Sequence, residues 1–71
     1  MAKVNNATIN VLIYRGCAIM EWEPWYLSED EKLFAAEIAV DDLIESVGED
    51  TPTGRMWQRY EHAIIRLRTR R

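Results

Sequence analysis

Cys17 and His62 are the residues from which nucleophilic chemistry would have to be built, because the chain holds a single cysteine and a single histidine. They lie far apart in the sequence, and no glycine-rich turn of a known catalytic type adjoins them to supply an oxyanion hole. His62 also falls between Arg59 and Arg66, whose positive charges oppose a metal ion. We therefore predict no catalytic residue, no metal site and no cofactor, and we expect a protein that is not an enzyme.

A ridge of carboxylates is the first charged surface that the sequence offers. Glu37, Asp41 and Glu45 follow one another at four-residue spacing, as on one face of a helix, and Asp30 extends the ridge. Such a stripe is usually a solvated face, and its oxygens also suit a hard cation. The interpretation that bears on function is docking on a basic protein surface, where complementary charge speeds association and selects the partner.

Aromatic residues crowd the segment just before this ridge, where Trp22, Trp25 and Tyr26 lie within five residues. No periodic pattern obliges Trp25 and Tyr26 to be buried, and Trp and Tyr are frequent anchors of protein interfaces. Two interpretations stay open. Both side chains cap the bottom of a small core, or they join the carboxylates in a partner-binding site.

A stripe of arginines is the second charged surface, and it lies in the C-terminal part of the chain. Arg55, Arg59, Arg66 and Arg70 follow helical spacing along one flank. Arginines so placed can neutralise nucleic-acid phosphates, pair with the carboxylates of the preceding helix, or meet an acidic surface of a partner or second subunit. Because the net charge is −3, we expect direct nucleic-acid binding less than contact with a protein.

Length and composition place these surfaces on one small folded domain. The chain has 71 residues, of which 48% are hydrophobic and 30% charged, as in globular proteins. Its apolar runs are too short to span a membrane, and a lone cysteine suits a reducing compartment, so we expect a cytoplasmic location. Charge is segregated: residues 28–50 hold nine acids against one lysine, and residues 51–71 hold six arginines against one acid.

The N-terminal segment has the period of a β-hairpin over residues 7–23. Ile9, Val11 and Ile13 alternate with more polar neighbours, and Met20 and Trp22 continue the apolar face after a short turn at residues 15–17. Pro24 would end the second strand, because proline cannot donate to a ladder.

Two helices are expected after the hairpin. Ser28 and Glu31 form a capping-box pattern that starts a helix over residues 29–47, and Gly48 is a natural terminator. A turn-rich loop then leads to a second helix over residues 53–68, with Thr51 or Thr53 as its N-cap.

A second apolar patch on the first helix favours self-association. Phe34 and Ile38 are four residues apart and lie away from the main apolar stripe of that helix. Either the hairpin or the Trp25–Tyr26 segment covers them, or they form the interface of a homodimer.

The sequence thus predicts a single α+β domain over residues 1–71, with the order ββαα. The function we expect is that of a small acidic protein-binding module, an inhibitor or adaptor of a larger nucleic-acid-handling complex. Small acidic proteins of bacteriophages, anti-CRISPR inhibitors among them, share this size and charge, and the analogy goes no further. The alternative is a dimeric regulator that binds nucleic acid through the arginine stripe.

Overall fold

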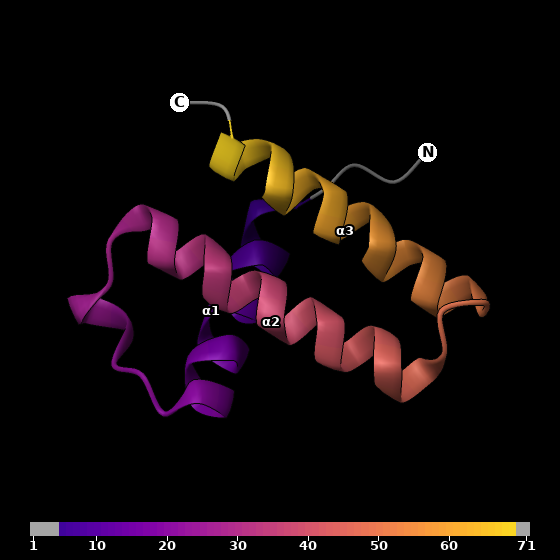
Figure 1. Cartoon of the computed structure of the whole chain (residues 1–71), viewed down its shortest axis with the longest axis horizontal. Helices are drawn as coiled ribbons and strands as arrows, with labels where there is room; N and C mark the ends of the chain where they lie inside the picture. The colour runs from indigo at the N-terminus through magenta and orange to yellow at the C-terminus, as the bar shows by residue number, and fades with distance from the viewer. Residues whose placement is uncertain (1–4, 70–71) are drawn as a thin grey trace.

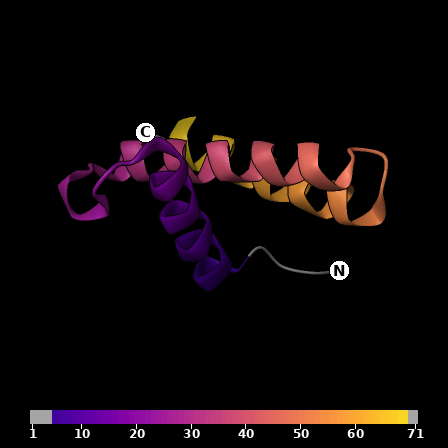
Figure 2. The same cartoon turned by 90° about the horizontal axis from the view of Figure 1, so that it is seen from below.

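Three α-helices and one short 3₁₀ turn make up the part of the chain that this computed structural model describes, residues 5–69. They are α1 (Asn6–Met20), η1 (Pro24–Tyr26), α2 (Glu29–Val47) and α3 (Pro52–Thr69). Helices α2 and α3 run antiparallel and side by side (Figure 1). Helix α1 crosses this pair at a steep angle, as Figure 2 shows.

The expected α+β fold is wrong, because residues 5–69 contain no strand and the predicted hairpin over residues 7–23 is replaced by α1. The buried residues of this segment are Ile9, Leu12, Gly16 and Cys17, whose spacing is that of one helical face. Val11, which a strand would have placed with Ile9, is instead 65% exposed. A run of neighbouring apolar residues is compatible with the period of a strand and with that of a helix. In this segment the buried residues follow the helical period.

Gly16 was predicted to lie in the turn of a hairpin. In the structure it lies within α1, at the point where this helix contacts α2. A Cβ atom built on Gly16 would lie 1.8 Å from the carbonyl oxygen of Ala35 in α2. Only glycine therefore lets the α1 backbone approach α2 this closely, and its low helix propensity is offset by that packing.

Both ends of α1 have the capping residues of a helix. Asn5 begins the helix, because its Oδ1 accepts a hydrogen bond from the Ala7 N–H at 2.8 Å. Glu21 ends it in the left-handed conformation, with φ of 58°. Trp22, predicted to lie in the hairpin, instead follows the helix and stacks at 6.1 Å, ring centroid to centroid, on Phe34 of α2.

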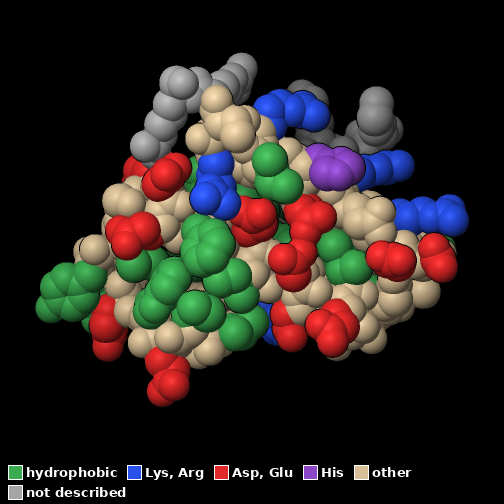
Figure 3. All heavy atoms as spheres, in the orientation of Figure 1, with side chains coloured by type: hydrophobic (Ala, Val, Ile, Leu, Met, Phe, Trp, Pro, Cys, Tyr) green, Lys and Arg blue, Asp and Glu red, His purple; other side chains and the backbone are tan. Residues whose placement is uncertain are grey.

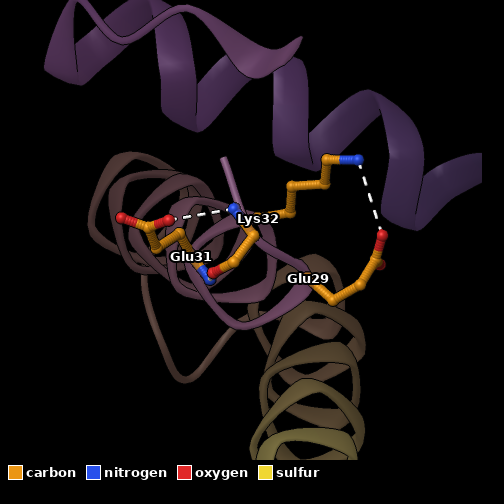
Figure 4. Close-up of polar contacts among 4 residues, drawn as sticks. Glu29, Glu31 and Lys32 are labelled. Carbon is orange, nitrogen blue, oxygen red and sulfur yellow. Dashed lines mark hydrogen bonds and ion pairs between the residues drawn. The ribbon is translucent and has the colours of Figure 1, made fainter. Parts of the chain in front are cut away.

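Helix α2 has the bounds that the sequence predicts, and its start is the expected capping box. The Glu31 N–H donates to Ser28 Oγ at 3.3 Å, and the Ser28 N–H donates to the Glu31 carboxylate at 2.9 Å. Figure 4 shows the Glu31 carboxylate turned back toward the helix start, and Lys32 facing Glu29 at 3.5 Å. The hydrogen bond that the Ser28 backbone N–H donates to the Glu31 carboxylate lowers the pKa of Glu31, and the Ser28 side chain acts in the same direction.

The loop between α2 and α3 is fixed by a second close contact. Thr51 is the N-cap of α3: its hydroxyl donates to the Gly48 carbonyl at 2.7 Å and accepts from the Gly54 N–H at 2.9 Å. A Cβ atom on Gly54 would lie 2.0 Å from that same carbonyl oxygen. Helix α3 can therefore begin this close to the end of α2 only with glycine at position 54.

The core lies where α1 and α3 meet the middle of α2. Leu12 from α1 and Ile64 from α3 are buried there on a surface of small α2 side chains, Ala36, Ala39 and Val40. Small residues on α2 allow both neighbours to pack close, so the central helix is the element against which the other two are placed.

We expect Gly16→Ala to lower the free energy of unfolding by about 2 kcal/mol or more, because the added methyl group would overlap the Ala35 carbonyl. Helix propensity alone predicts the opposite, a gain of about 1 kcal/mol. Urea denaturation followed by circular dichroism measures the change. Ala18→Gly, at an exposed position of the same helix, is the matched control and should cost only the propensity difference. A stabilised Gly16→Ala variant would rule out the close contact.

Candidate functional site

A hollow of about 530 Å³ lies between the C-terminal half of α2 and the middle of α3. Its lining residues are Asp41, Ile44, Glu45, Gly48, Glu49, Gln58, Glu61 and His62, and we call it the acidic groove. In Figure 3 acidic side chains gather over the region where α2 and α3 meet, with the histidine beside them. Four of the eight lining residues carry a carboxyl group, so the groove favours a cationic group.

The groove follows from the antiparallel register of α2 and α3. Asp41 and Glu61 are each ten residues from Thr51, the N-cap of α3, on opposite sides of the loop. Folding the chain back at this loop brings the two carboxyl groups together across the helix pair. The charge count of the sequence includes Glu61 only as the single acid of a basic helix, so the site was not predicted. The equal distance of Asp41 and Glu61 from the loop is the signal that could have predicted it.

Asp41 and Glu61 form a carboxyl–carboxylate pair. Their hydrogen bond raises the pKa of Glu61 to about 7, and burial and the negative charges of Asp41 and Glu37 act in the same direction. A carboxylic acid that keeps its proton near neutral pH can donate to a neighbouring carboxylate, which two ionised groups cannot do. The pair therefore binds one proton under conditions in which separate carboxyl groups would be ionised.

The carboxylates of α2 differ in how they are neutralised. Glu37 forms an ion pair with Arg68 of α3, and Asp42 pairs with Arg15 of α1 at 3.0 Å. Asp41 and Glu45 are exposed, and neither makes an ion pair within residues 5–69. The predicted ridge is therefore divided: its Glu37 end is neutralised internally, and its Asp41–Glu45 end faces the groove.

The structure does not bring the predicted aromatic and acidic residues into one site. Trp25 and Tyr26 lie in η1 and are 72% and 79% exposed, so neither caps the core. Asp30 is half-buried in the first turn of α2. Asp41 lies three turns further along, about 18 Å in helix rise from the start of α2. The acidic groove and the exposed aromatics are two separate surfaces.

The patch predicted for self-association is partly covered. Phe34 lies between the Trp22 ring and the Arg68 guanidinium, which is 5.3 Å from the centre of the phenyl ring. It remains 40% exposed, and Ile38 is half-buried. The sequence predicted that the hairpin or the Trp25–Tyr26 segment would cover this patch. In the structure Trp22, which follows α1, covers part of it.

The arginine stripe lies on the solvent side of α3. Arg55, Arg59 and Arg66 are exposed, and none of them forms an ion pair with another residue in the described range 5–69. Arg70 lies outside the described residues. Arg68, which extends the stripe, is the one arginine of α3 that forms an ion pair with a carboxylate of α2 within residues 5–69.

Cys17 and His62 belong to different helices, Cys17 to α1 and His62 to α3. Cys17 is buried, which raises the pKa of its thiol, while the charge of Lys32 near the start of α2 acts in the opposite direction. His62 is exposed and lines the acidic groove beside Asp41. The structure therefore does not unite them as a nucleophile and base, and residues 5–69 contain no cluster suited to a metal ion.

Comparison of the chain with protein-family models, curated proteins and solved structures finds no match. None of the helices within the described residues has both the length and the apolar character needed to cross a membrane. The function must therefore be argued from the surfaces themselves.

The Asp41–Glu61 pair makes stability depend on pH in an unusual direction. The unfolded chain loses the Glu61 proton near pH 4.5, whereas the folded protein holds it up to about pH 7. Because the folded state binds more protons in this window, we expect the pair's contribution to stability to be full below pH 4.5 and lost as the pH rises through 7. Thermal melts between pH 5 and pH 8 measure this loss.

Glu61→Gln should remove the dependence, because the amide donates to Asp41 at every pH, and should raise the melting temperature at pH 8. Glu23→Gln, which neutralises an exposed glutamate outside the groove, should leave the pH profile unchanged. A wild-type profile that matches that of Glu61→Gln would show that the pair holds no proton.

Proposed function

We propose that the chain is a non-enzymatic protein-binding module whose acidic groove receives basic side chains of a partner protein. The observation that carries the proposal is a hollow with four carboxyl groups in its lining, those of Asp41, Glu45, Glu49 and Glu61. An arginine or lysine from a partner would pair with these carboxylates and displace the proton that Asp41 and Glu61 share.

The partner chemistry that fits is a basic surface of the kind that binds phosphates. The groove presents several carboxylates, as a nucleic-acid backbone presents several phosphates, and a basic surface attracts both. Occupation of such a surface by Asp41 and Glu45 would exclude nucleic acid from it. This is the basis for an inhibitor or adaptor role in a nucleic-acid-handling complex.

A second function is supported by the exposure of the arginine stripe. Arg55, Arg59 and Arg66 are available on the outer side of α3, where they can contact phosphates. A dimeric nucleic-acid-binding regulator would use them in this way. The acidic groove lies beside the same helix and repels a nucleic acid, which is why the protein-binding function is preferred.

The proposal is tested with a short arginine peptide as the probe, titrated into the labelled protein and followed by NMR. We expect amide shifts centred on Asp41, Glu45 and Glu61, and an affinity that falls with added salt. Asp41→Asn with Glu45→Gln should weaken binding by about tenfold, which corresponds to about 1.4 kcal/mol.

The matched control is Glu21→Gln with Glu23→Gln, which changes the net charge equally but outside the groove. Equal weakening by the two double variants would show that only net charge matters and would overturn the assigned site. A duplex or single strand that binds at physiological salt and is released by Arg59→Glu with Arg66→Glu would favour the second function instead.

A further inference from the structure

Within residues 5–69, no other element covers one face of α1. Helix α1 packs on α2 through Ile9, Leu12, Gly16 and Cys17, while its opposite side faces solvent. The outward residues at successive turns are Ala7, Val11, Tyr14 and Ala18, with Asn10 beside them. Val11 is 65% exposed and Tyr14 is 63% exposed, so the apolar character of this face is open to water.

The same surface continues onto η1. A hollow of about 240 Å³ separates the two elements and is lined by Asn10, Ile13, Tyr14, Pro24, Trp25 and Lys32. Trp25 is 72% exposed, and its ring lies 6.3 Å, centroid to centroid, from that of Tyr26. The outward side of α1 and the aromatic pair of η1 thus form one continuous surface, which we call the α1 face.

The outward side of α1 carries little charge, and the exposed carboxylates of Glu21 and Glu23 lie at its edge, in the linker to η1. Arg15 is the only charged side chain of α1, and Asp42 of α2 pairs with it at 3.0 Å. Lys32, at the edge of the hollow, extends from α2 toward α1 and pairs with Glu29 at 3.5 Å (Figure 4). In a chain with 30% charged residues, this face differs from the acidic groove and from the arginine stripe.

We infer that the α1 face is the contact surface for a second copy of this chain. A two-fold interface sets the same patch against itself, so like charges on it would oppose one another, and the α1 face avoids that repulsion. The exposed Tyr26 lies next to the hollow that Trp25 and Tyr14 line. In a two-fold contact, a projecting ring of one copy can enter the hollow of the other.

The exposed aromatic side chains of the α1 face supply about half of the area that a standard interface needs on each partner. Aromatic side chains bury about 150–250 Å² each, so Tyr14, Trp25 and Tyr26, at 63–79% exposure, offer about 300–500 Å² together. The α1 side chains around Val11 add to this total, and a standard interface needs about 800 Å² per partner. Phe34 and Ile38 offer less, because the Trp22 ring and the Arg68 guanidinium cover part of Phe34.

Light scattering over a range of micromolar concentrations tests the inference. We expect a mass approaching twice 8.4 kDa as the concentration rises. Val11→Glu with Trp25→Glu should raise the dimer dissociation constant at least tenfold. Because both side chains are mostly exposed, the circular dichroism spectrum should remain helical.

Val47→Glu, at the end of α2, is the matched control and should leave the dissociation constant unchanged. Three results would overturn the inference: a monomer at every concentration, a dimer that persists in the double variant, or a dimer lost in Phe34→Ala alone. A monomer that binds phosphatidylcholine–phosphatidylglycerol vesicles through Trp25 would assign the face to lipid instead and would overturn it too. The acidic groove plays no part in this contact, so the peptide titration tests the proposed function separately.

Discussion

The backbones of α1 and α2 meet directly at Gly16 and Ala35, and this contact positions the other elements of the fold. It fixes the crossing point of the two helices and brings Leu12 onto the small side chains of α2. With no room for a side chain at this point, α1 is held at a single position along α2. The same crossing determines which side of α1 is buried and which side faces solvent. The residues on the exposed side therefore become part of the molecular surface.

A second glycine contact sets the other half of the molecule. The Gly48 carbonyl accepts from Thr51 and leaves no space for a Cβ atom on Gly54, which fixes where α3 begins relative to the end of α2. The register that results places Glu61 opposite Asp41 and Arg68 beside Glu37. Whether two charged residues attract or repel across this pair therefore depends on the length of one short loop.

Local signals in the sequence predict α2 and α3 well, and they fail for α1. The Ser28 capping box and Gly48 lie within a few residues of the helix ends that they determine. The ends of α2 can therefore be predicted without knowledge of the tertiary structure. The role of Gly16 depends on a helix distant in sequence, and taken alone it reads as a turn. Glu21 ends α1 in a left-handed conformation more typical of glycine or asparagine, so no terminator was visible.

Prediction of the site had the same limits. The acidic residues of α2 and the exposed arginines of α3 follow from helical spacing, but their partners do not, because spacing gives no distance between elements. Trp25 and Tyr26 were joined to the carboxylates by their closeness in sequence, and the length of α2 separates them in space. Glu61 gains its place only from the packing of α3 on α2, which the charge count of its own helix conceals.

If the acidic groove binds a basic ligand as proposed, that ligand would exchange for the proton shared by Asp41 and Glu61. A cation that settles between the two carboxyl groups lowers the pKa of Glu61 and expels the proton into the buffer. Association is then coupled to proton release, and the measured heat of binding includes the ionisation enthalpy of whichever buffer takes up that proton. A count of formal charges, in which Glu61 is ionised, therefore overestimates the attraction of the groove for a basic ligand below about pH 7.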